Sequence, residues 1–220
     1  MATVSRGRPP VFSLPNQLTA ARFVLALVLF FIITEALWLP AIVVFAVAAF
    51  TDWLDGYLAR KQGLSSTLGR NLDPLVDKIL ICGAYIFLLP FGMKTHQPDA
   101  AALGAAGEGW LVPWMVTVIV GRELVITSLR SFMENRGVTF GADWLGKLKM
   151  GLQCAGLFAI FAALWAASAT APEQLETNNL IGFLESVRNG LIWAMLAATA
   201  LSGLQYLWRA ASVLKVDWES

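Results

Sequence analysis

Charged residues are scarce in this chain of 220 residues. They make up 14% of it, whereas water-soluble domains usually carry about 25%. Hydrophobic residues make up 57%, and the mean hydropathy is +0.64. This composition excludes a water-soluble globular protein and predicts an integral membrane protein. At about 20 residues per helical crossing, six crossings with short loops leave no room for a soluble catalytic domain.

The chain also lacks an excess of charge of either sign. Its 16 Lys and Arg residues and 15 Asp and Glu residues give a net charge of +1, so we expect no nucleic acid partner. The two cysteines, Cys82 and Cys154, lie inside apolar segments, and we expect reduced thiols rather than a disulfide. The single histidine, His96, is too isolated to be a metal ligand.

Long apolar segments predict an all-α integral membrane fold, because only a helix satisfies the backbone hydrogen bonds of such a segment inside lipid. We place six transmembrane helices at 18–37, 38–61, 73–92, 109–132, 148–171 and 187–209. Residues 1–17 are expected to form a cytoplasmic tail and a short interfacial segment. Residues 18–211 then form the six-helix domain, and residues 212–220 form a second cytoplasmic tail.

Basic residues gather on one side of this predicted bundle. That side holds both tails, the connection between the second and third spans, and the connection between the fourth and fifth. The opposite side has little beyond Lys94 and Arg188. The positive-inside rule therefore predicts that both termini are cytoplasmic. A short chain without a transit peptide favours a bacterial inner membrane.

Ionisable residues interrupt four of the predicted spans near their cytoplasmic ends. They are Arg22, Asp52, Asp55, Asp77, Lys78, Arg122 and Glu123. A charge within a span costs at least about 2.5 to 3.5 kcal/mol and usually faces a polar cavity. Four helices with charges at one depth therefore predict a functional site at the cytoplasmic side. Snorkelling to the interface is an alternative for Arg22, but aspartate side chains are too short for it.

One face of the second span carries most of its polar residues. At about 100° per residue, its polar and small residues fall in an arc of about 140°; they are Asp52, Asp55, Gly56, Ala59 and Arg60. The glycine and the alanine keep this face small enough for a ligand to approach the backbone. We expect the face to line a binding site.

Two further aspartates open the third span. Asp73 precedes Pro74 and is expected to cap this helix, which places Asp77 one turn deeper on the same side. A short polar connection then folds the four aspartates into one pocket. Hard divalent cations, Mg²⁺ or Mn²⁺, would relieve their repulsion, and two such ions can polarise both oxygens of a phosphoryl displacement. Asp77, the deepest, is our candidate general base.

The complete pattern, D-x2-D-G-x2-A-R-x8-G-x3-D-x3-D from Asp52 to Asp77, resembles the signature of the CDP-alcohol phosphotransferases at every position. The resemblance implies a six-helix membrane fold, usually homodimeric, that transfers a phosphatidyl or related group from a CDP-linked donor to an alcohol. It also implies that Asp52, Asp55, Asp73 and Asp77 bind two divalent ions. The donor would be held by Asn16, Thr19, Gly56, Ala59, Arg60, Ser66 and Gly69.

A second group of cations lies around the fourth and fifth spans: Arg122, Arg130, Lys147 and Lys149. Cations beyond those that the donor needs point to an acceptor with its own phosphate. Arg122 and Arg130 lie about 80° apart on a helical wheel, so both could line one broad pocket. We expect Glu123 to orient Arg122. A basic loop that only sets topology is the alternative for each of these cations.

Local stretches narrow the resemblance further. GRELVITSLR, GKLK, DWLDGYLARK and LDPLVDK are similar to the corresponding stretches of phosphatidylglycerophosphate synthases. The implied reaction joins CDP-diacylglycerol and sn-glycerol 3-phosphate into phosphatidylglycerol phosphate and CMP. The same chemistry with inositol phosphate, serine or phosphatidylglycerol as acceptor stays open. A membrane prenyltransferase that binds a lipid diphosphate is the alternative from another class.

Overall fold

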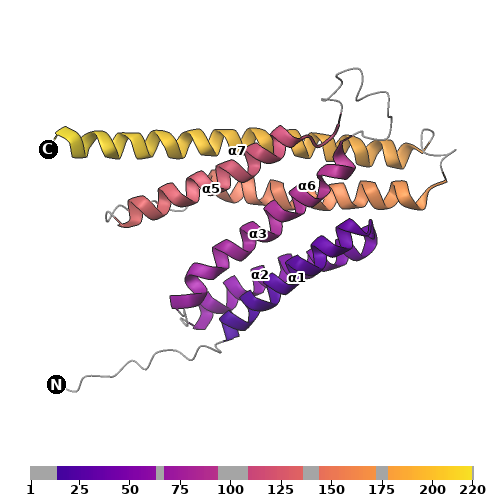
Figure 1. The fold of residues 1–220 in the computed structure, drawn as a ribbon, viewed down its shortest axis with the longest axis horizontal. Helices are drawn as coiled ribbons and strands as arrows, with labels where there is room; N and C mark the ends of the chain where they lie inside the picture. Colours follow the sequence, from indigo (N-terminus) through magenta and orange to yellow (C-terminus); the bar gives the residue numbers. More distant parts are fainter. Residues whose placement is uncertain (1–13, 63–66, 94–108, 136–143, 172–177, 220) are drawn as a thin grey trace. The chain divides into compact units, whose positions relative to one another are not determined.

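The computed structural model describes residues 14–62, 67–93, 109–135, 144–171 and 178–219, and the regular structure in these ranges is helical. The helices are α1 (Leu14–Thr34), α2 (Trp38–Gln62), α3 (Thr67–Gly92), α5 (Pro113–Asn135), α6 (Trp144–Ala169) and α7 (Asn179–Glu219) (Figure 1). The predicted all-α fold is confirmed for these residues.

Several of these helices are suited to a bilayer. Four contain a stretch long and apolar enough to cross one, at Gln17–Thr34 in α1, Leu75–Gly92 in α3, Trp144–Ala169 in α6 and Asn179–Ala211 in α7. In α2 the apolar part, Trp38–Asp52, is shorter. The chain is thus an integral membrane protein. The predicted count of six spans and the cytoplasmic position of the termini stay predictions.

The helices differ from the predicted spans mainly at their ends. α1 begins at Leu14, inside the segment expected to be interfacial, and holds Pro15 in its first turn, where no N–H is needed. α3 begins at Thr67, so the prediction that Asp73 caps it with Pro74 in the first position is wrong. Membrane helices tolerate an internal proline because neighbouring groups can satisfy the freed carbonyl.

α7 is much longer than the predicted span 187–209, with 41 residues. Its start is fixed by Asn178, whose Oδ1 accepts the N–H of Leu180 at 3.0 Å, as an N-cap does. The helix then continues through Glu185 and Arg188, which pair at 3.6 Å across one turn. The prediction followed an uncharged run, whereas these two charges stay inside the helix by pairing.

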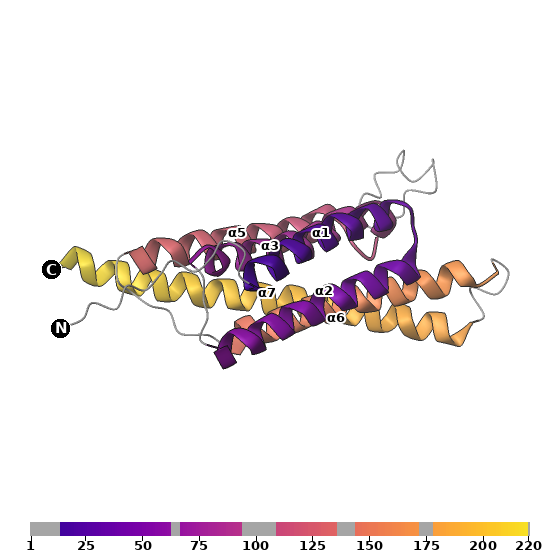
Figure 2. The same cartoon turned by 90° about the horizontal axis from the view of Figure 1, so that it is seen from below.

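The chain divides into two compact units, Met1–Gly83 and Ala84–Ser220, with the boundary inside α3. In the first unit, α1 and α2 pack as an antiparallel pair (Figures 1 and 2). In the second unit, α7 packs against both α6 and α5 (Figure 1).

The turn between α1 and α2 has a Schellman geometry. The N–H of Leu37 reaches the carbonyl of Ile32 at 3.1 Å, and the N–H of Ala36 reaches that of Ile33 at 3.0 Å. Ala36 adopts a φ of 53°, a left-handed conformation in which a Cβ is strained. Glycine is the residue that usually occupies this position.

We expect Ala36→Gly to stabilise the protein. Relief of the left-handed strain gains about 1 to 2 kcal/mol, and the larger entropy of glycine in the unfolded chain offsets about 0.4 to 1 kcal/mol of it. Thermal unfolding in detergent should show a small increase in Tm. The same change at Ala197, exposed in the middle of α7, should lower the free energy of unfolding by about 1 kcal/mol. Shifts of equal sign would contradict the strain argument.

A buried stripe on each helix builds the first unit. On α1, Ala26, Leu29 and Ile33 are fully buried at helical spacing. On α2, Ala41, Phe45 and Ala48 form the matching stripe. The small alanines let the two backbones approach closely, as is common between membrane helices.

α3 meets α1 through a glycine in this unit. A Cβ built on Gly83 would collide with the ring of Phe30, so the ring lies directly against the backbone of α3. A side chain at position 83 would require the ring of Phe30 to move.

The second unit is held partly by polar contacts. Tyr85, fully buried in the last part of α3, donates its hydroxyl hydrogen to the carbonyl of Gln153 on α6 at 3.0 Å. Gly156, one turn further along α6, leaves room for that hydroxyl. Apolar residues of α5, α6 and α7 fill the rest of the core, among them Ile119, Leu157 and Ile192.

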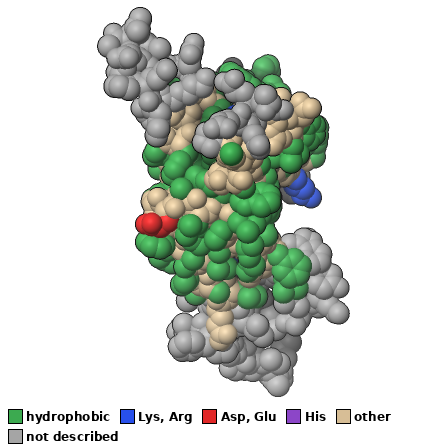
Figure 3. Space-filling model, turned by 90° about the vertical axis from the view of Figure 1, so that its right-hand side faces the viewer, with side chains coloured by type: hydrophobic (Ala, Val, Ile, Leu, Met, Phe, Trp, Pro, Cys, Tyr) green, Lys and Arg blue, Asp and Glu red, His purple; other side chains and the backbone are tan. Residues whose placement is uncertain are grey.

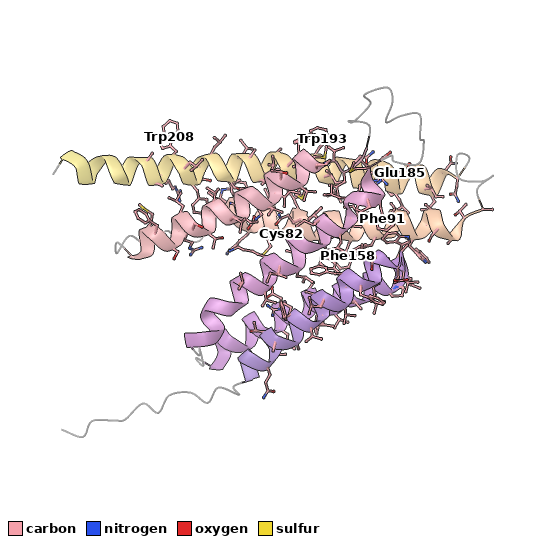
Figure 4. The ribbon with its side chains drawn as sticks, in the orientation of Figure 1. Cys82, Phe91, Phe158, Glu185, Trp193 and Trp208 are labelled. Carbon is pink, nitrogen blue, oxygen red and sulfur yellow. The ribbon has the colours of Figure 1, made fainter. Side chains whose placement is uncertain are left out.

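The exposed surface is largely apolar. Hydrophobic side chains dominate the face seen in Figure 3, and charged side chains there are few. Trp208, 80% exposed, projects outward from α7 (Figure 4). Such a surface fits contact with lipid. Both cysteines are free thiols, as predicted, although Cys154 is only half-buried.

Candidate active site

A buried arginine joins three helices in the first unit. Arg22 of α1 has no exposed surface. Its Nη1 atom lies 2.9 Å from Oδ1 of Asp52 on α2 and 2.7 Å from Oδ1 of Asp77 on α3. We call these three residues the carboxylate site.

Helical spacing explains why these residues meet. Arg22 continues the buried stripe of α1, one turn before Ala26, and Asp52 continues the stripe of α2, one turn after Ala48. Since α1 and α2 are antiparallel around the turn at Ala36, both stripes end at a similar depth. The ion pair between Arg22 and Asp52 therefore lies at one end of the apolar core of the unit.

The snorkelling alternative for Arg22 is wrong, because its side chain is buried and paired. The two carboxylates are more accessible, with side chains 36% exposed for Asp52 and 24% for Asp77. A ligand can therefore reach the aspartates while the arginine lies behind them. Sequence reasoning noted Arg22 as a charge at the same depth but did not assign it to the site.

The donor atoms of the carboxylate site fit a hard divalent cation. One oxygen of Asp52 and one of Asp77, on different helices, lie within hydrogen-bonding distance of Nη1 of Arg22. Carboxylate oxygens are the ligands that Mg²⁺ and Mn²⁺ prefer. Within the described part of the chain, no group of three acidic, histidine or cysteine side chains forms a larger site. The side chains of Asp55 and Asp73 lie outside that part, and their predicted role as ligands stays a prediction.

The predicted donor-binding residues are described only in part. Thr19 is buried on α1, one turn before Arg22. Asn16 lies in the first turn of α1. Four others lie along α2 and α3, but their surroundings are outside the description; they are Gly56, Ala59, Arg60 and Gly69. Ser66 falls outside the described residues altogether.

A second group of charges lies in the core of the second unit. Arg122 donates to Oε1 of Glu123 at 3.2 Å, and Lys149 of α6 contacts the same oxygen. On α7, the hydroxyl of Ser202 accepts a hydrogen bond from Arg122 at 3.0 Å, and the ring of Tyr206 lies 5.8 Å from its guanidinium carbon. We call these five residues the α5–α7 cluster.

The four predicted acceptor cations separate into two pairs. Arg122 and Lys149 lie together in the α5–α7 cluster, with Lys149 only 4% exposed. Arg130 and Lys147 are exposed on α5 and α6. The predicted contact between Glu123 and Arg122 is confirmed, and its link to Lys149 is an addition that sequence reasoning missed.

The polar residues of α7 were also missed. Ser202 and Thr199 are fully buried, and their hydroxyls lie within an apolar run that gives no hydropathy signal. In the second unit, four buried polar atoms have no hydrogen-bond partner among the described residues: Nε of Arg122, Nε2 of Gln153, Oγ1 of Thr199 and Oε1 of Gln205. The spacing of Thr199, Ser202 and Tyr206 on one face of the helix was the available signal.

Comparison with known proteins places most of the chain in one family. Residues 12–201 match the family model described as CDP-alcohol phosphatidyltransferase. The match includes both the carboxylate site and most of the α5–α7 cluster.

Several curated relatives carry the name CDP-diacylglycerol–glycerol-3-phosphate 3-phosphatidyltransferase. The chain is 30% identical to the Bacillus subtilis protein over 222 residues, which cover 94% of this chain and all of the relative. It is 30% identical to the Pseudomonas fluorescens protein over 94% of this chain and 90% of the relative. The Escherichia coli protein is 32% identical over 66% of this chain and 75% of the relative.

Proposed function

This chain belongs to the CDP-alcohol phosphatidyltransferase family, and we propose that it transfers a phosphatidyl group from CDP-diacylglycerol to sn-glycerol 3-phosphate. The products are phosphatidylglycerol phosphate and CMP. The names of the relatives support this choice of substrates. The structural observation that carries the proposal is the convergence of Asp52 and Asp77, on different helices, at the same nitrogen of Arg22.

We propose that Asp52, Asp55, Asp73 and Asp77 bind two divalent ions, Mg²⁺ or Mn²⁺. The described pair, Asp52 and Asp77, supplies oxygen ligands from α2 and α3. Positions 55 and 73 lie one turn nearer the connection between these helices, on the faces that carry 52 and 77. When bound, the ions would stabilise the charge on the attacking and leaving oxygens.

The protein's own groups complete the displacement. The 1-hydroxyl oxygen of the acceptor forms a bond to the phosphorus that bears diacylglycerol, while the bond from that phosphorus to the CMP oxygen breaks. Asp77 accepts the hydroxyl proton, a role that suits a carboxylate at the partly exposed end of a buried pair. The electron pair of the broken bond leaves with CMP.

The donor is proposed to bind along α1, α2 and the start of α3. Arg60 suits a pair of diphosphate oxygens because its guanidinium is planar and always charged. The other proposed contacts are Asn16, Thr19, Gly56, Ala59, Ser66 and Gly69. The acyl chains of the donor would stay in the lipid, next to the exposed apolar side chains of the protein.

The acceptor phosphate is proposed to bind Arg122, Arg130, Lys147 and Lys149. The position of Arg122 and Lys149 at one carboxylate oxygen supports this, since groups that donate to a carboxylate also suit a phosphate. Arg130 and Lys147, being exposed, could contact the phosphate as it enters. We further propose that the site faces the cytoplasm of a bacterial inner membrane and that the enzyme is a homodimer.

CMP release by the purified protein tests the proposal. The protein in detergent would be given CDP-diacylglycerol and Mg²⁺ with glycerol 3-phosphate, inositol phosphate, serine, phosphatidylglycerol or no acceptor. We expect glycerol 3-phosphate to support release at least about 100-fold faster than serine, which brings no phosphate to the proposed acceptor cations. Release should also be faster with glycerol 3-phosphate than with inositol phosphate or phosphatidylglycerol. Chelation should stop the reaction, and added Mg²⁺ should restore it.

Two outcomes would contradict the proposal at different levels. Faster release with serine or inositol phosphate would overturn the assignment of glycerol 3-phosphate as the acceptor, and the proposed reaction class would remain. Failure to release CMP with every acceptor, together with pyrophosphate release from a prenyl diphosphate, would overturn the class itself.

A further inference from the structure

Arg22 and a bound cation would share the same two carboxylates. Oδ1 of Asp77 accepts from Arg22 at 2.7 Å, and Oδ1 of Asp52 lies 2.9 Å from the same Nη1 atom. A divalent ion binds a carboxylate oxygen at about 2.1 Å. Two positive groups on one carboxylate then lie within a few ångströms of each other, where like charges repel strongly.

We propose that Arg22 is a positioning residue that competes with the divalent ions for Asp52 and Asp77. Its guanidinium holds the two carboxylates together across three helices and, by its charge, lowers the affinity of the site for metal. Since Arg22 has no exposed surface, it cannot turn away into water when a cation arrives. The repulsion therefore persists in the loaded site unless an anion offsets it.

The donor diphosphate is the anion that the proposed function supplies. Arg22 would therefore make strong metal binding depend on the nucleotide, because the diphosphate compensates the charge that the arginine adds. By linkage, the metal would strengthen nucleotide binding by the same factor. This inference rests on the metal-dependent part of the proposed function.

Mn²⁺ affinity, measured without substrate, tests the competition. Free Mn²⁺ would be followed by its EPR signal during titration of the full chain in detergent. We expect Arg22→Gln to bind Mn²⁺ about tenfold more tightly than the wild type, since a positive charge next to the ligand oxygens is removed. Arg22→Lys keeps the charge, and its affinity should lie closer to that of the wild type.

Arg188→Gln is the matched control. Arg188 is also a buried arginine in an apolar helix, 5% exposed, but it pairs with Glu185 and lies over the ring of Trp110 at 4.6 Å. Loss of this arginine should lower the thermal stability and leave the Mn²⁺ affinity unchanged. A general effect of removing a buried cation would instead appear in both glutamine variants.

Thermal unfolding with and without Mn²⁺ is a second measurement, which tests the competition even if Arg22→Gln is less stable than the wild type. Without Mn²⁺, Arg22→Gln should unfold at a lower temperature than the wild type, because its two carboxylates repel each other. Saturating Mn²⁺ should then raise its Tm by more than that of the wild type. Equal Mn²⁺ affinity in the wild type and in Arg22→Gln, or weaker binding by the variant, would overturn the competition alone. Failure of every variant to bind Mn²⁺ would overturn the metal proposal and this inference together.

Discussion

Asp77→Asn is expected to lower kcat by at least about 1,000-fold while CDP-diacylglycerol binding changes by less than about tenfold. The amide keeps the size of the side chain and can still accept a hydrogen bond from Arg22, which lies 2.7 Å from the carboxylate. It cannot take the proton of the attacking hydroxyl, and loss of a general base alone costs about 100- to 10,000-fold. CMP release and donor binding, measured on one preparation, separate the two effects.

Glu185→Gln provides the control for removing a carboxylate charge. Glu185 has a side chain 51% exposed and pairs with Arg188 at 3.6 Å, so its amide should leave kcat near the wild-type value. If Asp77→Asn kept more than about a tenth of the wild-type kcat, Asp77 would not be the base. Its proposed role would then pass to another carboxylate of the motif.

Glu123→Ala is expected to destabilise the fold by about 3 to 5 kcal/mol. Both Arg122 and Lys149 contact Oε1 of Glu123, and removal of that carboxylate leaves a buried lysine and a half-buried arginine without their anionic partner. Tm in detergent should fall by several degrees or more. Glu185→Ala removes a carboxylate that is 51% exposed and lies 3.6 Å from Arg188, so it should cost less than about 1 kcal/mol.

A double variant separates the structural role of this carboxylate from a role in binding. Glu123→Leu with Lys149→Met removes both charges of a buried pair, and we expect it to be more stable than Glu123→Leu alone. Activity should remain low, because Lys149 is proposed to bind the acceptor phosphate. Stability and activity that recover together would contradict that role. A double variant no more stable than Glu123→Leu would show that the ion pair is not what holds the cluster.

Helix positions could be predicted from the sequence where apolar composition decides them. The predicted second span, 38–61, differs from α2 by a single residue at its end. Prediction failed where a long-range contact keeps a charge inside a helix. α7 continues through Arg188 because Trp110 and Glu185 stabilise that arginine, and neither contact is visible in a hydropathy profile.

The site was predictable as a set of residues more than as a set of contacts. The spacing of the aspartates identified Asp52 and Asp77, and a helical wheel could place each on a face of its own helix. Arg22 joins them across 30 and 55 residues of sequence, and a wheel drawn for one helix carries no information about such pairs. Glu123 was linked to its neighbour Arg122, whereas its contact with Lys149 depends on how α5 and α6 pack.

The contact between Phe30 and Gly83 has a consequence for how the enzyme responds to its membrane. Phe30 lies about 12 Å along α1 from Arg22, so α1 is fastened to α3 at two separate heights, by a ring on a glycine and by an ion pair. Bilayers of different thickness change the tilt of transmembrane helices. Because two contacts hold α1 against α3, we expect these helices to tilt together. The distance between Arg22 and Asp77 should then change little with the thickness of the bilayer.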